Sequence, residues 1–273
     1  MKLSCLPVSF FSEIMDAKMS ILDWAQMGAS LGLDGIDLSI LFVKDHSPGA
    51  LSKMRQEIED EGMRVAMITS YPDFTHPDRN QRQKELALEQ QVVKVAKTLG
   101  AELVRVTAGQ AHPETGIADG IEWAVEGLTN LVISSQDSGV RLVYENHAKP
   151  GAWQYTDFSQ PPEIFLEIFS RTEAVNLGVN FDVGNAAVFA ADPLAFLNQV
   201  IQRVVSIHAS DSATKGELNH VLLGTGITPY AQMFACLKQS GWDGWICMEE
   251  GAQMGRQGVE KAAKFIRKTW EQA

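Results

Sequence analysis

The sequence predicts an α/β protein of the (β/α)8 barrel class, built as one domain over residues 1–273. Short apolar runs alternate with longer amphipathic stretches along the whole chain, and eight such runs are present. A barrel of this class takes roughly 250 residues, which is close to the length of this chain. A doubly wound open sheet is the alternative, but it usually has fewer strands, and no glycine-rich phosphate loop follows the first run. These observations favour the barrel.

The apolar runs are the expected strands. Most of their positions are apolar, as suits parallel strands that are buried on both faces. In chain order they are residues 3–8 (LSCLPV), 35–40 (GIDLSI), 64–70 (RVAMITS), 103–109 (LVRVTAG), 141–147 (RLVYENH), 177–184 (LGVNFDVG), 204–211 (VVSIHASD) and 244–250 (GWICMEE).

The stretches between the runs have helical periodicity. In Gln81–Leu99, apolar residues recur at the spacing of one helix face amid charged neighbours, and Gly100 follows where a helix would end. Glu114–Gln136 and Gly255–Trp270 are also expected to be helices, and Pro150–Gln160 is expected to be the largest irregular segment.

Charge and cysteine usage argue against several classes of protein. The chain has 23 Lys and Arg against 34 Asp and Glu, a formal net charge of -11, so a nucleic-acid partner is not expected. Three scattered cysteines without paired spacing indicate free thiols in a reducing, cytoplasmic environment. The N-terminus lacks a long apolar region with a cleavage site, and no run is long enough to span a membrane. A cytoplasmic protein without a membrane partner is therefore expected.

Four consecutive expected strands end on ionisable side chains. Glu145 ends the fifth, Asp182 the sixth, His208 the seventh, and Glu249 or Glu250 the eighth. The C-terminal ends of barrel strands meet at one mouth, so these groups are expected to converge. Carboxylates brought together repel one another unless a cation lies between them. Each residue alone is more often a helix cap or ion-pair partner, but the repetition favours a site for Mn²⁺, Mg²⁺ or Co²⁺.

At these residues the chain resembles the xylose isomerase-like TIM-barrel superfamily, a group of sugar (phosphate) isomerases and epimerases. Tagatose 3-epimerase-like enzymes, hydroxypyruvate isomerases and inosose dehydratases belong to it. The resemblance covers nearly the whole chain and is specific for the superfamily, not for one substrate. The matching segments are GLDGIDLS, LVYENH, VNFDVGN, SIHASDS, LLGTGITPY and GWDGWICMEE.

The resemblance implies that Glu145, Asp182, His208 and Glu249 hold one divalent metal ion. Mn²⁺ is favoured, with Mg²⁺, Co²⁺ or Zn²⁺ as alternatives. It also implies that Glu145 and Glu249 remove and return a proton next to a carbonyl of a small carbohydrate, through an enediolate that the metal stabilises. Asn185 stands where tagatose 3-epimerase-like members often have a histidine, which is a departure from those epimerases.

Other polar residues near the strand ends are weaker candidates for substrate contacts, and each also has an ordinary structural role open to it. They are His147, Asn146, Asn185, Asp211, His220 and Arg105.

The leading functional hypothesis is a metal-dependent isomerase or epimerase. A lyase that removes water after the same proton abstraction is the first alternative. An apurinic-site endonuclease would need more histidine and acidic ligands and a less acidic surface, and a non-enzymatic ligand-binding barrel would not need the intact ligand positions. Barrels of this kind often pair, so a homo-oligomer is compatible with the sequence.

Overall fold

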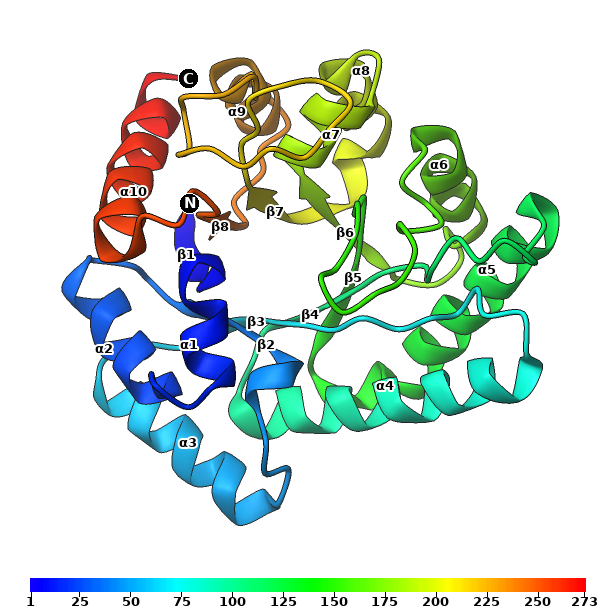
Figure 1. Ribbon diagram of the computed structural model, residues 1–273, viewed down its shortest axis with the longest axis horizontal. Helices are drawn as coiled ribbons and strands as arrows, with labels where there is room; N and C mark the ends of the chain where they lie inside the picture. The colour runs from blue at the N-terminus through cyan, green and yellow to red at the C-terminus, as the bar shows by residue number, and fades with distance from the viewer.

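The computed structural model describes residues 1–273 and shows eight parallel strands surrounded by helices (Figure 1). The strands follow the order β1-β8-β7-β6-β5-β4-β3-β2, and β1 packs beside β2 to bring the sheet round into a barrel. The predicted single-domain (β/α)8 class is confirmed. The strands are β1 (Lys2–Leu6), β2 (Ile36–Ser39), β3 (Val65–Thr69), β4 (Leu103–Val106), β5 (Arg141–Glu145), β6 (Gly178–Asp182), β7 (Val204–Ala209) and β8 (Trp245–Glu249).

The helices form an outer ring around the strands (Figure 1). They are α1 (Phe11–Met15), α2 (Ile21–Ser30), α3 (Pro48–Asp60), α4 (Arg79–Leu99), α5 (Ile117–Ser134), α6 (Pro162–Arg171), α7 (Val183–Phe189), α8 (Pro193–Val200), α9 (Tyr230–Gln239) and α10 (Gly255–Gln272). Short 3-10 turns are η1 (Val8–Phe10), η2 (Ile40–Phe42), η3 (Gln136–Ser138) and η4 (Ile201–Arg203).

The three expected helices are present as α4, α5 and α10. Helix α4 ends at Leu99 and is capped by Gly100, whose φ of 73° lies in the left-handed region that glycine adopts without strain. The largest irregular segment is not at Pro150–Gln160, as expected from its polar composition, because residues 210–229 between β7 and α9 form a longer one. Within that segment the Asp211 carboxylate accepts hydrogen bonds from four backbone N–H groups.

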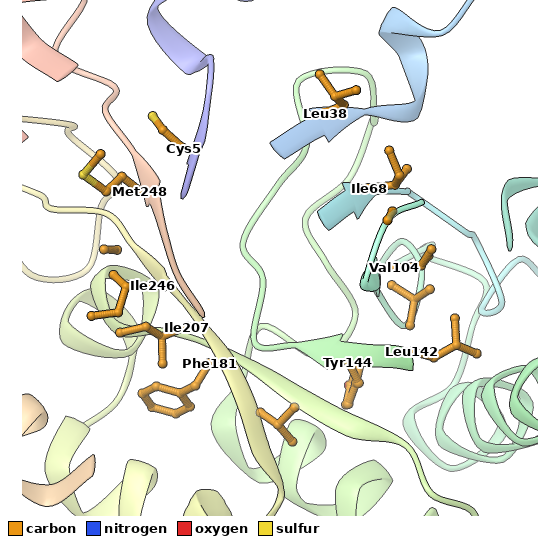
Figure 2. Close-up of a cluster of buried hydrophobic side chains, with 14 of the residues drawn as sticks. Cys5, Leu38, Ile68, Val104, Leu142, Tyr144, Phe181, Ile207, Ile246 and Met248 are labelled. Atoms are coloured by element: carbon orange, nitrogen blue, oxygen red, sulfur yellow. The ribbon is translucent and has the colours of Figure 1, made fainter. Parts of the chain in front are cut away.

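The main hydrophobic core lies between the strands and the helices. It is one cluster of 58 buried residues, to which every strand contributes. Figure 2 shows members of this layer from all eight strands, among them Leu38, Val104 and Phe181. Each fully buried side chain of this kind stabilises the fold by about 1.5–3 kcal/mol relative to an exposed one. The barrel is therefore held mainly by the outer face of its wall.

The inner face of the wall has a different composition. Its apolar part is a separate cluster of only six buried residues, Ala66, Met67, Leu103, Val143, Trp245 and Cys247. Other positions on this inner face carry buried polar side chains instead: Ser4, Asp37, Arg105, Glu145, Asn180, Asp182, Ser206 and His208.

The remaining sequence expectations concern cysteines and membranes. All three cysteines are free thiols, and Cys5 and Cys247 are buried, as expected. Among the helices, none combines the length and apolarity that crossing a bilayer would require.

Candidate active site

The register of the parallel sheet places the predicted ligands side by side. Asp182 at the end of β6 is the Cα partner of His208 in β7, and Glu145 at the end of β5 is the partner of Asn180 in β6. Strands β5, β6 and β8 each end on a predicted ligand, and β7 ends one residue after His208. The ligand positions therefore gather at the C-terminal mouth of the barrel, where sites of this fold lie.

Three of the four predicted ligands form a compact group. Ligating atoms of Glu145, Asp182 and His208 all lie within 4.8 Å of one another. The His208 Nδ1 atom lies 2.5 Å from Glu145 Oε1 and 3.2 Å from Glu249 Oε1. Glu249 thus borders the group without belonging to its tightest part, and its side chain is 17% exposed whereas those of Glu145 and His208 are 0% exposed.

Neighbouring charges set the protonation of this group. Burial alone would raise the pKa of Glu145, but the charges of His208 and Arg105 hold that pKa well below its ordinary value. Burial lowers the pKa of His208, yet Glu145 and Glu249 more than reverse this and raise it to about 9. Burial, together with repulsion from Glu249 and Glu145, raises the pKa of Asp182 to about 8. Burial and the neighbouring carboxylates together thus favour a proton on Asp182 when no cation balances their charge.

These residues fit a divalent cation. Neither ring nitrogen of His208 has hydrogen-bond geometry with a partner, although the ring is fully buried and Nδ1 is close to two carboxylates. Buried polar atoms without partners are rare in native proteins. Carboxylate oxygens with one imidazole nitrogen form a donor set that suits Mn²⁺, Mg²⁺, Co²⁺ or Zn²⁺.

Asp182 is held by its own strand end and by the residues after it. Its Oδ1 accepts hydrogen bonds from the backbone N–H of Asn185 at 2.8 Å and from the Ser210 hydroxyl at 2.9 Å, so it also caps α7. The Asn146 amide brackets the Asp182 backbone, donating to its carbonyl at 2.9 Å and accepting from its N–H at 2.8 Å. The side chain of Asn146 is therefore engaged in fixing the position of Asp182.

A cavity of about 280 Å³ adjoins the cluster. Glu249 and Asp182 line it, whereas Glu145 and His208 do not. Four of the predicted substrate contacts also line it: Arg105, His147, Asn185 and His220. Four of its apolar lining residues come from the end of β1 and from the segments after β1 and β2: Leu6, Val8, Phe11 and Leu41.

Two of the lining residues have clear local roles. Arg105 is fully buried, and its Nε lies 2.9 Å from Glu145 Oε2, so it neutralises that carboxylate. Burial lowers the pKa of His147 to about 3, and its buried Nδ1 has no hydrogen-bond partner. His147 lines the cavity, and a neutral imidazole has one nitrogen that donates and one that accepts a hydrogen bond.

Two carboxylates near the strand ends do not face the cavity. The Asp211 carboxylate accepts backbone N–H groups of Ser212, Gly224, Gly226 and Thr228, and so organises the segment between β7 and α9. Glu250 accepts from the Ser9 hydroxyl at 2.5 Å and from the Ala252 N–H at 2.8 Å, so it points away from Glu249.

Sequence reasoning missed several residues of the site. Asn180 donates to Glu145 Oε1 at 2.9 Å, and Tyr71 and Lys149 line the cavity. Asn180 could have been found, because it precedes Asp182 by two residues and so lies on the same face of its strand. Tyr71 and Lys149 lie in loops beyond strand ends, where no periodicity marks a direction.

Comparison with known proteins places the chain in a family. A family model described as xylose isomerase-like TIM barrel matches residues 25–269. The uncharacterized protein MJ1311 of Methanocaldococcus jannaschii is 26% identical over 208 residues, covering 73% of this chain and 67% of that protein. An inosose dehydratase of Lacticaseibacillus casei is 23% identical over 180 residues, covering 55% of this chain but only 58% of the dehydratase.

Solved structures share the fold over the full length. The IolI protein with a bound zinc atom has a TM-score of 0.81 at 18% identity, covering 100% of this chain and 99% of that one. A D-tagatose 3-epimerase-like protein has a TM-score of 0.80 at 18% identity, covering 99% and 97% of the two chains. At these identities the likeness shows the fold. The family model spans most of the sequence, and the chain belongs to the xylose isomerase-like TIM-barrel family.

Proposed function

We propose that this protein is a divalent-metal-dependent isomerase or epimerase that acts on a sugar or sugar derivative by moving a proton next to a carbonyl group. The observation that carries the proposal is the convergence of Glu145, Asp182 and His208 within 4.8 Å, beside a cavity that Asp182 and Glu249 line. Relatives and structural neighbours that are named as sugar epimerases or inosose dehydratases support the same class of chemistry.

In this proposal the chain's residues divide the work by position. Glu145, Asp182, His208 and Glu249 hold the metal. Glu249 lines the cavity and exchanges a proton with the substrate, and Glu145 acts as the second acid-base group. When bound, the divalent cation supplies Lewis-acid stabilisation of the negative charge that develops on the substrate oxygens.

The substrate contacts in this proposal are the lining residues. Arg105, His147, Asn185 and His220 line the cavity and carry groups that donate or accept hydrogen bonds, which supports this assignment. Asn146 and Asp211 act indirectly, because their side chains are already bonded to the backbone of Asp182 and to the segment after β7.

A dehydratase is the second candidate, and the match to inosose dehydratases favours it. Removal of water begins with the same proton abstraction as isomerisation, so the same carboxylates would serve both reactions. The two reactions differ only after that step, in whether the proton returns to carbon or a neighbouring hydroxyl leaves.

The shared first step can be tested before the substrate is known. The metal-free protein, reloaded with Mn²⁺, would be incubated in D₂O with ketohexoses, 3-keto sugars and inososes, and deuterium at the carbon beside the carbonyl would be followed by NMR. We expect exchange with at least one of these compounds. Epimer formation would support the isomerase, and loss of the adjacent hydroxyl the dehydratase. No exchange with any of them, by protein shown to bind Mn²⁺, would count against the proposal.

A further inference from the structure

Three polar residues form one row across the inner wall of the barrel. Glu145 in β5 is the Cα partner of Asn180 in β6, and Asn180 is the partner of Ser206 in β7. All three side chains are fully buried. Asn180 and Ser206 do not line the cavity, so a role for them must act through a neighbour.

The row has a fixed direction. The Ser206 hydroxyl donates to Asn180 Oδ1 at 2.7 Å, and Asn180 Nδ2 donates to Glu145 Oε1 at 2.9 Å. Reversing the amide would set its oxygen against the carboxylate of Glu145, which accepts hydrogen bonds only. Ser206 therefore favours the one amide orientation that presents a donor to Glu145.

Each carboxylate oxygen of Glu145 has a polar partner. Asn180 contacts Oε1, and Arg105 lies 2.9 Å from Oε2. Arg105 is itself fixed, because its Nη1 donates to the Ser70 carbonyl at 2.9 Å and its guanidinium lies over the Tyr71 ring. Arg105 supplies charge from the cavity side, whereas the contribution of Asn180 is a directed hydrogen bond from a neutral group.

We infer that Asn180, oriented by Ser206, is a positioning residue that fixes the Glu145 carboxylate for metal binding; this inference rests on the proposed function. A carboxylate that is already held in one orientation loses less conformational entropy when it binds the cation, and this favours binding. Partners of metal ligands act in this way in other metal sites, where their removal weakens metal affinity by about 10–100-fold.

The test measures metal affinity rather than turnover. Mn²⁺ would be titrated into the metal-free full-length protein by calorimetry. Asn180→Leu removes the donor while keeping a similar volume, and we expect it to weaken Mn²⁺ binding by about 10–100-fold. Ser206→Ala leaves the amide in place but frees its orientation, so its loss of affinity should be smaller. The double variant should bind no more weakly than Asn180→Leu alone, because both changes break the same chain of contacts.

Ser4→Ala is the matched control. Ser4 is equally buried inside the barrel, but its hydroxyl donates to Asp37 rather than toward Glu145, so Mn²⁺ affinity should not change. Thermal unfolding of each variant would establish that it folds. If Asn180→Leu does not fold, the Mn²⁺ affinity of Ser206→Ala tests the inference instead. Wild-type affinity in folded Asn180→Leu, or equal affinities in Ser206→Ala and Ser4→Ala, would overturn the inference alone. Absence of Mn²⁺ binding by the wild type would overturn the proposed function and this inference with it.

Discussion

The two faces of the barrel wall are made by alternate residues of the same strands, yet the outer face is mainly apolar and the inner face is largely polar. On β6, Val179 and Phe181 face outward into the apolar layer beneath the helices, whereas Asn180 and Asp182 face inward. The outer layer is one continuous cluster of 58 buried residues, and the apolar part of the inner face has six.

This difference separates stability from chemistry. Burial of apolar side chains on the outer face stabilises the fold, while the buried carboxylates and imidazole on the inner face oppose it unless they are paired. Successive side chains of a strand point to opposite faces, so one strand can supply apolar residues to the outer core and polar residues to the inner face. Substitutions on the inner face should therefore change activity or metal affinity more than stability, and substitutions on the outer face should do the reverse.

The largest effect is expected at the inner face. Glu249→Gln keeps the shape of the side chain but removes its ability to exchange a proton with a ligand in the cavity. We expect the rate of deuterium exchange to fall by about 10²–10⁴-fold with little change in melting temperature. Glu250→Gln is the control, because that carboxylate contacts Ser9 and Ala252 instead of the cavity, and it should retain activity. Equal rates for the wild type and Glu249→Gln would reject the acid-base assignment.

The outer face should give the reverse signature. Phe181 is fully buried and packs edge-on against Phe196, with ring centroids 5.2 Å apart. Phe181→Ala should lower the free energy of unfolding by about 3–5 kcal/mol, measured by urea denaturation. Mn²⁺ affinity of the folded fraction should stay close to that of the wild type. A large loss of affinity with little loss of stability would break the proposed separation between the faces.

Replacing an inner ligand should change metal affinity first. His208→Ala removes the only imidazole of the cluster, and we expect Mn²⁺ binding to weaken by more than the roughly 10–100-fold typical of indirect partners. The metal-free protein should also lose stability, because the protonated ring offsets the buried charges of Glu145 and Glu249 when no cation is bound. Calorimetry and thermal unfolding of the same sample would separate the two effects; unchanged affinity would exclude His208 as a ligand.

The contrast between the faces also explains what the sequence could predict. Strand positions follow from apolar runs, and parallel strands bring their ends together, so the convergence of Glu145, Asp182 and His208 was predictable. The hydrogen bonds of Asn180 were not, because they depend on the register between β5, β6 and β7. The contacts of Asp211 depend on the conformation of residues far along the same loop, up to Thr228, which no local pattern specifies.

Glu89 is a buried carboxylate on a helix rather than on a strand of the barrel. It belongs to α4, and its Oε2 accepts a hydrogen bond from the Ser70 hydroxyl at 2.7 Å. Burial raises its pKa to about 8, only partly offset by the bond from Ser70. The folded protein thus holds a proton on Glu89 that the unfolded chain releases above its ordinary pKa of 4.5. Its contribution to stability is present at low pH and is lost as pH rises toward 8.

Glu89→Gln keeps an acceptor for the Ser70 hydroxyl but cannot ionise. Near pH 5 the variant and the wild type should have similar stability. Between pH 5 and 8 the wild type should lose stability relative to the variant by at most about 1.4 kcal/mol per pH unit. Urea denaturation across this range would measure the slope, and chelating the metal should not change it, because Glu89 lies outside the metal cluster. If the pH dependence of the unfolding free energy disappeared on chelation, Glu89 would be coupled to the metal site. If it persisted, the effect of Glu89 on stability would be independent of that site.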